Sequence, residues 1–494
     1  MTSLRTGARD SLLLALGALV AAGLGLVSLR LLLTGLSEED YGHYALFLTA
    51  GGLLSVLLDW PVHSVLRLGS EEAEEGGRGG RTLGSVGVVV LGCLALVAPL
   101  AWLFRERIDA EIGRPAWSLA LLFAALSAGA SLGYQLLQPF GKNHLRTLLP
   151  VVPRFLFALA LVVVTVIGAQ RLDFERAAWL ATLTIAPVVL LAPLIVRPGP
   201  PRTAPSEVGR TLSFGLPLLA RNLGVAGVLF VDVLVVRHLL GPVAAGRYDV
   251  AYRIGEQVVA FGFVLTFLSG PILARAAARG DRGALERFYR LGAPPLVWLW
   301  GLGAALGIVV AEPLLHLLGA KSPGASAAVL QVLLLAVAIR GAAVLEIAVF
   351  QAHLLSRWPT LFFFLGFLLN LGLDLALLRA GWGLVGPAWA TVAGFALQAV
   401  LRAGYIQRGF RVPALAPYLG LLPVAAVLLA VRLGSAPLAG AVWVVAVVLV
   451  LGLGRRTRLF SRDARALLAE VSMPARVRAA LNWLHAGPSQ EANP

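Results

Sequence analysis

The chain has 494 residues, of which 58% are hydrophobic and 14% charged, and its mean hydropathy is +0.83. Soluble domains carry about 25% charged residues, so this composition excludes a soluble protein and indicates a polytopic membrane protein. The formal net charge of +15 would suggest a nucleic-acid ligand in a soluble protein. Positive loops on one side of a membrane explain it here, and we expect no nucleic-acid partner. A single cysteine, Cys93, excludes an intrachain disulfide and a multi-cysteine metal site.

Fourteen apolar segments are long enough to cross a bilayer, which takes about 20 apolar residues in a helix. They lie at about 10–34, 41–67, 82–104, 115–140, 147–170, 175–196, 210–238, 245–273, 288–316, 324–352, 358–379, 383–406, 413–432 and 436–454. The sequence therefore predicts an all-α polytopic membrane protein with about 14 transmembrane helices.

The distribution of basic residues predicts the orientation of these spans. Arginines concentrate in every second loop and in the segment after Gly454, and the loops between them hold far fewer. Loops rich in Lys and Arg face the cytoplasm. We therefore expect a multi-pass membrane protein with both termini cytoplasmic.

Two short motifs indicate an internal repeat. Gly42-His43-Tyr44 opens the second span and Gly246-Arg247-Tyr248 opens the eighth. Six spans separate them, so the two halves would share one orientation about an axis along the membrane normal. The predicted organisation is an N-terminal six-helix lobe at 1–196, a Pro-rich cytoplasmic linker at 197–209, a C-terminal six-helix lobe at 210–411, two additional transmembrane helices at 412–454 and a basic amphipathic cytoplasmic tail at 455–494.

The central stretch, 209–281, holds two apolar runs around a turn at Gly241-Pro242. These runs carry four ionisable residues, Arg221, Asp232, Arg253 and Glu256. Each costs about 2.5–3.5 kcal/mol at the centre of a membrane helix, so they must face a partner helix or a wet cavity. Arg221 and Asp232 are eleven apart, on nearly the same side of a helix. Arg253 and Glu256 are three apart and can touch.

Further ionisable residues fall within other spans. A cavity lined by several guanidiniums suits an anionic substrate, because Arg binds phosphate through paired hydrogen bonds. Acidic residues could couple transport to protons or Na⁺, or pair with these arginines and only fix helix packing. We predict the substrate-binding residues to be Arg30, Arg154, Arg221, Asn222, Arg253 and Arg340. The predicted ion-coupling or charge-pairing residues are Asp59, Asp232, Glu256, Glu346 and Asp374.

Two of these acidic residues have a simpler alternative. Asp59 with Arg67, and Asp374 with Arg379, could be ion pairs at helix ends. Asp59 precedes Trp60-Pro61, where we expect a kink in the second span. No nucleotide-binding glycine loop, HExxH zinc motif or Gly-x-Ser-x-Gly elbow occurs in the sequence. We therefore expect no enzymatic activity, no catalytic residues, no metal centre and no cofactor.

The motifs together resemble a known family. The run from Leu31 to Glu72 contains an acidic loop and Tyr41-Gly42-His43-Tyr44-Ala45. The second half contains Val231-Asp232, Gly246-Arg247-Tyr248-Asp249-Val250-Ala251-Tyr252-Arg253 and Pro271-Ile272-Leu273-Ala274-Arg275. In this pattern the chain is similar to Wzx-type oligosaccharide flippases, which are polysaccharide transporters of the multidrug/oligosaccharidyl-lipid/polysaccharide superfamily.

The resemblance implies two six-helix lobes around a central cavity that opens alternately to either side, plus the two extra C-terminal helices. The implied substrate is an undecaprenyl-pyrophosphate-linked oligosaccharide repeat unit, moved from the cytoplasmic to the outer leaflet for surface polysaccharide biosynthesis. The implied partners are this polyprenyl-pyrophosphate-linked oligosaccharide, membrane lipids, and glycosyltransferases or a polymerase of the same pathway. Arg221, Asp232 and Arg253 would face the cavity from spans 7 and 8, and Arg30 from span 1.

Three alternatives remain open on the sequence. The two extra spans also fit a lipid II flippase of the same superfamily. A drug/cation antiporter of that superfamily predicts a mainly acidic cavity, which the mid-span arginines disfavour. A membrane polymerase or ligase acting on the same lipid carrier typically needs a large external loop, and the sequence predicts only short ones.

Overall fold

The computed structural model of the chain describes residues 2–456, except 138, 141–144, 146–147, 169–170, 279–280, 353–356 and 435. All regular structure in these residues is helical, as the sequence predicts. The first half holds α1 (Thr2–Gly35), α2 (Glu38–Asp59), α3 (Val65–Glu74), α4 (Gly80–Leu103), α5 (Arg105–Ile112), α6 (Trp117–Leu137), α8 (Val151–Val162), α9 (Phe174–Leu183) and α10 (Ala186–Val196). The predicted tail at 455–494 lies almost wholly outside the described residues.

The described residues of the second half are helical as well. It holds α11 (Pro205–Leu240), α12 (Pro242–Ala278), α13 (Arg282–Arg287), α14 (Ala293–Leu317), α15 (Pro323–Ala342), α16 (Val344–Ala352), α17 (Arg357–Arg379), α18 (Val385–Phe410), α19 (Leu422–Leu433) and α20 (Ala436–Arg456). Single turns of 3₁₀ or π helix extend some of these helices, η1 (Trp60–Ser64), η2 (Val163–Ile167), η3 (Phe288–Gly292) and η4 (Ala416–Leu421).

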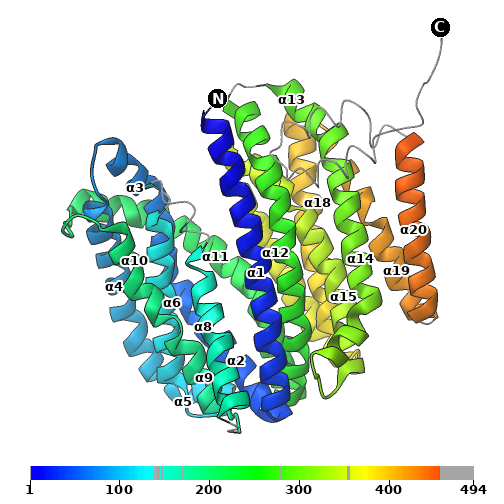
Figure 1. The fold of residues 1–494 in the computed structure, drawn as a ribbon, viewed down its shortest axis with the longest axis horizontal. Coiled ribbons are helices and arrows are strands. Elements are labelled where there is room, and N and C mark those ends of the chain that lie inside the picture. The colour runs from blue at the N-terminus through cyan, green and yellow to red at the C-terminus, as the bar shows by residue number, and fades with distance from the viewer. Residues whose placement is uncertain are drawn as a thin grey trace.

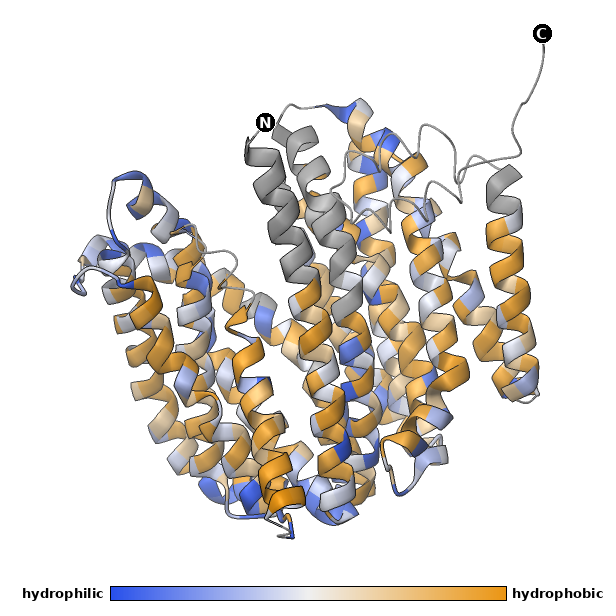
Figure 2. Ribbon diagram, in the orientation of Figure 1, coloured by the Kyte–Doolittle hydropathy of each residue, from blue (hydrophilic) through white to orange (hydrophobic). Residues whose placement is uncertain are grey.

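The helices have the length and surface of membrane spans. Among the described residues, nine helices are long and apolar enough to cross a bilayer, and α11 adds a tenth if its two bent halves count as one span. Figure 2 shows apolar residues along most of each helix and hydrophilic residues gathered at the helix ends and loops. The structure confirms the all-α membrane fold, and the count of fourteen spans stays a prediction.

Local sequence explains where the helices begin and bend. Ser37 caps α2 by accepting a hydrogen bond from the Asp40 amide, and the acidic first turn of α2 complements the helix dipole. The predicted kink at Trp60-Pro61 is confirmed, because α2 ends at Asp59 and continues as the 3₁₀ turn η1. The predicted turn at Gly241-Pro242 is confirmed as well. Gly241 has φ +91°, a conformation that favours glycine, and Pro242 opens α12.

Two groups of helices form the molecule (Figure 1). The first group contains α2 to α10 and the second contains α12 to α20. Helix α1 lies at their boundary, where it packs against α8 of the first group and α12 of the second. Helix α11 crosses from one group to the other, since it packs on η1, α2 and α4 and also on α12 and α17. The predicted domain boundaries stay a prediction.

The two groups meet at one end of the bundle, which we call the closed end. It carries the α1–α2 turn, the α11–α12 turn and the α14–α15 loop. The two Gly-x-Tyr motifs pack against each other there, because a Cβ added at Gly246 would lie 3.0 Å from the Cα of Gly42. A Cβ at Gly42 would overlap the carbonyl oxygen of Pro242. The repeated motif thus marks a close backbone contact between the two halves.

The two C-terminal helices attach to the second group. Helix α19 packs on α14 and α15, and α20 packs on α14 and α19. Close backbone approach fixes this attachment, because a Cβ added at Gly420 would lie 2.6 Å from the backbone nitrogen of Trp298. The indole of Trp443 donates a hydrogen bond to the carbonyl of Leu302 at 3.0 Å.

Candidate functional site

A cavity of about 490 Å³ lies at the boundary between the two groups. Residues of α1, α2, α6, α8, the α9–α10 region and α12 line it. Its polar lining residues are Ser28, Tyr44, Ser127, Tyr134, Arg154, Thr184, Arg253 and Gln257. Two of the arginines predicted to bind substrate, Arg154 and Arg253, therefore share one cavity although they are far apart in the sequence.

Arg154 is the unpaired cation of this cavity. It lies in the first turn of α8, and its side chain is exposed towards the cavity. No carboxylate pairs with it within the part of the chain that the structure describes, and Tyr134 of α6 is its polar neighbour. A guanidinium without a counter-charge, in a site where charge is costly, favours binding of an anion.

Arg253 is paired differently from the sequence expectation. Its Nε–H donates to Oδ2 of Asp249 at 2.5 Å, and the same oxygen accepts a hydrogen bond from the Tyr41 hydroxyl at 3.0 Å. The expected contact of Arg253 with Glu256 is wrong. Asp249 lies one full turn before Arg253 on the same face of α12, whereas Glu256 faces α15.

Glu256 instead forms an ion pair with Arg340 of α15, with Oε1 and Nη1 2.5 Å apart. The guanidinium of Arg340 also lies 5.6 Å from the centre of the Phe395 ring, a cation–π distance. Neither residue lines the cavity. The structure therefore places Glu256 and Arg340 in a charge pair between α12 and α15, the alternative that the sequence left open for such residues.

A second polar cluster is buried among α11, α12, α17 and α18. Oδ2 of Asp232 accepts hydrogen bonds from the Tyr248 hydroxyl at 2.6 Å and the Thr391 hydroxyl at 2.5 Å. Asp374 and Asn370 of α17 lie beside the Asp232 carboxyl. Asp232 is 1% exposed, and Asp374 and Asn370 are 0% exposed. The expected alternative pair of Asp374 with Arg379 is therefore wrong, since Asp374 points into this cluster.

This cluster lacks hydrogen-bond partners for several of its atoms. Within the described residues, Oδ1 of Asp232, both carboxyl oxygens of Asp374 and both polar side-chain atoms of Asn370 have none. Two buried carboxyl groups side by side cannot both carry charge without a proton or a cation between them. The side-chain atoms of this cluster that could bind a cation are all oxygens, which suit a hard cation such as Na⁺. Among the described residues there is no group of three or more His, Cys, Asp or Glu side chains that could hold a metal ion.

Glu346 belongs to a third buried site, at the junction of α16, α18 and η4. Its Oε2 lies 3.6 Å from Nε of Arg402, and both side chains are at most 3% exposed. The Tyr418 hydroxyl donates to Oε1 at 2.5 Å, and the Arg402 guanidinium lies 5.1 Å from the centre of the Phe363 ring. Glu346 therefore pairs charge between C-terminal helices and does not line the cavity.

The remaining predicted residues lie apart from the cavity. Arg30 donates a hydrogen bond to the carbonyl of Leu317 at 2.9 Å, near the closed end. Asp59 ends α2 beside Ser131. The alternative pairing of Asp59 with Arg67 is wrong, because Arg67 pairs with Glu71 at 3.3 Å on the first turns after the kink.

Arg221 and Asn222 both lie on α11. The side chain of Arg221 lies outside the described residues, so its expected role stays a prediction. Asn222 does not line the cavity, and its role in substrate binding also stays a prediction.

The sequence reasoning missed several residues that complete these sites. They are Tyr41 and Asp249 beside Arg253, Tyr134 beside Arg154, and Tyr248 and Thr391 around Asp232. Asp249 could have been found, because it precedes Arg253 by four residues on one helix face. The others lie on different helices from their partners, and no spacing rule connects them.

A family model described as "Polysaccharide biosynthesis protein" matches residues 8–277, which is more than half of the chain. No curated protein matches in sequence.

Solved structures share the fold. The lipid II flippase MurJ in an inward closed conformation has a TM-score of 0.67 at 14% identity, covering 90% of this chain and 100% of that chain. An inward-facing multidrug resistance MATE family transporter of the MOP superfamily has a TM-score of 0.61 at 14% identity, covering 83% and 99%. A MOP superfamily transporter from Pyrococcus furiosus has a TM-score of 0.57 at 15% identity, covering 85% and 96%. These likenesses show that the chain has the fold of MurJ and of the MATE transporters, and the family match shows that it belongs to the polysaccharide biosynthesis protein family.

Proposed function

We propose that the chain is a flippase for undecaprenyl-pyrophosphate-linked oligosaccharide repeat units, which it moves from the cytoplasmic to the outer leaflet by alternating access. The observation that carries this proposal is the unpaired Arg154 in a polar cavity at the boundary of the two helix groups. An anionic headgroup supplies the counter-charge that Arg154 lacks. Arg253 adds a guanidinium from α12 on the facing side, and on the sequence prediction Arg221 would add another positive charge.

The composition of the cavity fits this substrate class. Hydroxyl and amide side chains, from Ser28, Ser127, Thr184 and Gln257, can exchange hydrogen bonds with sugar hydroxyls, and Tyr44 and Tyr134 present both an aromatic face and a hydroxyl. A volume of about 490 Å³ falls in the usual range of ligand sites. It accommodates a pyrophosphate with the first sugars, and the polyprenyl chain stays in the lipid.

The buried carboxyl cluster supports coupling to a cation gradient. Asp232 and Asp374 require a proton or a cation to neutralise them, and neither residue lines the substrate cavity. Loading and release of that charge would repack α11, α12, α17 and α18, and α11 and α12 also contact helices of the first group. Coupling to Na⁺ or to protons is therefore part of the proposal.

The arrangement in the cell follows from the charge of the loops. The N-terminal end would face the cytoplasm, so the closed end would face outwards in the bacterial cytoplasmic membrane. The partners would be the lipid-linked oligosaccharide, surrounding lipids, and glycosyltransferases or a polymerase of the same pathway. The transport step requires no covalent chemistry, so the chain would not be an enzyme.

Complementation tests this proposal. The wild-type chain, Arg154→Ala and the control Arg176→Ala are expressed at equal membrane levels in a strain that lacks its own oligosaccharide flippase. The control removes an exposed arginine in the first turn of α9, where it is paired with Asp173. We expect surface polymer with the wild type and the control and none with Arg154→Ala. A parallel strain that lacks its lipid II flippase separates the two lipid-linked substrates. Rescue of that strain alone would assign lipid II instead.

A further inference from the structure

Asp249 joins the cavity to the contact between the two helix groups. Its Oδ2 accepts from Arg253, one turn along α12, at 2.5 Å and from the Tyr41 hydroxyl of α2 at 3.0 Å. The Asp249 side chain is 3% exposed and that of Arg253 is 32% exposed. A solute in the cavity can therefore reach Arg253 but not Asp249.

The hydrogen-bonded triad of Tyr41, Asp249 and Arg253 lies between two cavities. Tyr44, Arg253 and Gln257 line the large cavity, whereas Tyr41 and Val250 line a smaller cavity at the closed end. The hydrogen bonds among Tyr41, Asp249 and Arg253 thus cross the wall that separates the substrate cavity from the closed end.

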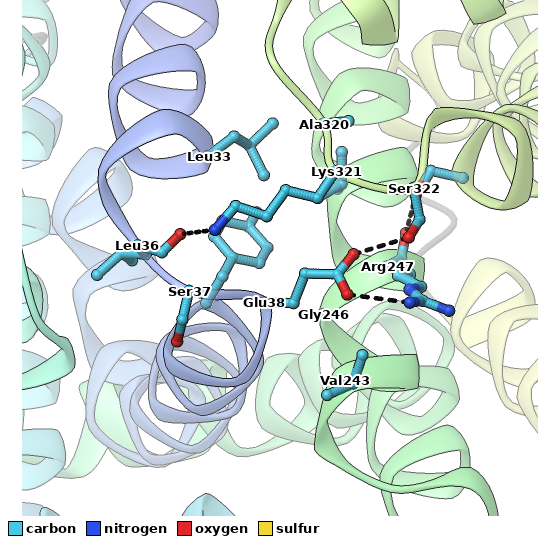
Figure 3. A pocket seen from close by; sticks show the side chains of 13 residues that line it. Leu33, Leu36, Ser37, Glu38, Val243, Gly246, Arg247, Ala320, Lys321 and Ser322 are labelled. Carbon is cyan, nitrogen blue, oxygen red and sulfur yellow. Dashed lines mark hydrogen bonds and ion pairs between the residues drawn. The ribbon is translucent and has the colours of Figure 1, made fainter.

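Further contacts between the groups surround the small cavity (Figure 3). Glu38 accepts a hydrogen bond from Nη2 of Arg247 at 3.0 Å and from the Ser322 hydroxyl at 2.8 Å. Nζ of Lys321 donates to the carbonyl of Leu36 at 2.6 Å. These bonds link the α1–α2 turn to α12 and to the α14–α15 loop, so the closed end is held by polar contacts that can reform as well as by packing.

An anion in the cavity competes with Asp249 for one guanidinium. Arg253 donates its Nε–H to Asp249. Its guanidinium has further N–H donors that can bind a phosphate. A phosphate bound to the Arg253 guanidinium weakens the interaction of that guanidinium with Asp249. The buried Asp249 carboxylate then loses stabilisation in a place where an unpaired charge is costly. The hydrogen bond from Tyr41 alone cannot replace a charged partner, so the wall around Asp249 must rearrange.

We propose that Asp249 is a positioning residue that couples occupation of Arg253 by an anionic headgroup to opening of the contact between α2 and α12. When the cavity is empty, Asp249 holds Arg253 and accepts from Tyr41, and the closed end stays shut. When an anion binds Arg253, this link weakens and opening is favoured. The inference rests on the proposed function for the anionic substrate, but the link itself is a property of Tyr41, Asp249 and Arg253.

The first test is the affinity for inorganic pyrophosphate, measured by calorimetry on the purified protein in lipid nanodiscs. Asp249→Asn removes the competing carboxylate, so we expect pyrophosphate to bind about tenfold more tightly, in the usual range for coupled sites. Arg253→Gln should weaken binding. Asp173→Asn, a matched change at the exposed cap of α9, should leave binding unchanged. A residue with a merely structural role would not tighten binding of a ligand when it is removed.

The second test reports on the closed end. Val250→Cys, introduced after Cys93→Ser, places a thiol at a position that is 3% exposed beside the small cavity. Pyrophosphate should increase the rate of maleimide labelling of this thiol. Tyr41→Phe and Asp249→Asn should each raise labelling without pyrophosphate, and Asp249→Asn should remove the response to it. Tyr405→Phe, in an aromatic cluster with Phe350, serves as the matched tyrosine control.

The outcomes separate the inference from the proposed function. Pyrophosphate that binds the wild type, with neither tighter binding in Asp249→Asn nor a labelling response, would overturn the role of Asp249 and leave the anion site intact. Absence of pyrophosphate binding to the wild type would overturn both. If Asp249→Asn does not fold, Tyr41→Phe decides, because unchanged labelling in that milder variant would contradict the coupling.

Discussion

Substitution of Gly42 by alanine should separate the two helix groups at the closed end. The added methyl carbon would lie 2.8 Å from the carbonyl carbon of Pro242 and would overlap its oxygen. Carbon atoms in contact prefer about 3.5–4.0 Å, so α2 and α12 must move apart by about 1 Å. Overpacking of this kind costs about 1–3 kcal/mol. The closed arrangement should therefore become about 5- to 150-fold less favourable relative to an open one.

Cross-linking with a short bis-maleimide measures this effect. Cysteines at Glu38 and Arg247, whose side chains are in contact across the groups, should be joined readily in a chain with Gly42 and poorly in one with Gly42→Ala. Gly23→Ala is the matched control, because a Cβ at Gly23 meets nothing within 4 Å. Equal cross-linking in both variants and the parent chain would refute the argument that glycine contact sets the approach of the two groups.

Other predictions concern the two buried sites of the second group. Asp232→Asn should reduce transport at least about tenfold and make it insensitive to collapse of Na⁺ and proton gradients, as measured by surface polymer in ionophore-treated cells. An unchanged response to the gradients would show that the cluster does not couple transport to them. Thr391→Val, which keeps both carboxyls but removes one oxygen, should shift transport to higher Na⁺ concentrations if the cation is Na⁺. Arg402→Leu should destabilise the protein by about 3–5 kcal/mol, because it leaves the buried Glu346 without a charged partner. Thermal unfolding in detergent should show that adding Glu346→Leu to this variant restores part of the lost stability. Additive losses in the double variant would contradict this.

The sequence predicts the membrane fold well for a physical reason. Backbone groups in lipid must be satisfied within each helix, so long apolar runs can be read directly as helices. The glycine at 241 and the proline at 61 mark a turn and a kink by local backbone rules. The Gly-x-Tyr repeat also locates the contact between halves, because only glycine permits so close an approach of α2 and α12.

The partners of the charged residues could not be predicted in the same way. Arg253 has Asp249 and Glu256 on its own helix, and sequence spacing allows both. The choice is made by α2 and α15, since Tyr41 comes to Asp249 and Arg340 comes to Glu256. Such contacts depend on how helices far apart in the chain pack, which single-helix periodicity does not contain.

The same limit applies to the two functional clusters. Asp232 and Asp374 are predicted as separate candidates, and only the packing of α11 against α17 brings them together. Arg154 gains its importance from the absence of an acidic neighbour among the described residues, which no motif reveals. Ionisable residues within spans are therefore found from the sequence, but whether they pair, couple or bind is decided by tertiary contacts.

Deletion of the gene in its own organism, with surface polymer and lipid-linked intermediates measured together, tests the central claim most directly. The account predicts that surface polymer is lost and that the undecaprenyl-pyrophosphate oligosaccharide accumulates on the cytoplasmic leaflet. The wild-type chain should restore export and Arg154→Ala, at equal membrane level, should not. Normal polymer in the deletion strain, or full restoration by Arg154→Ala, would contradict a cationic cavity that carries the lipid-linked oligosaccharide.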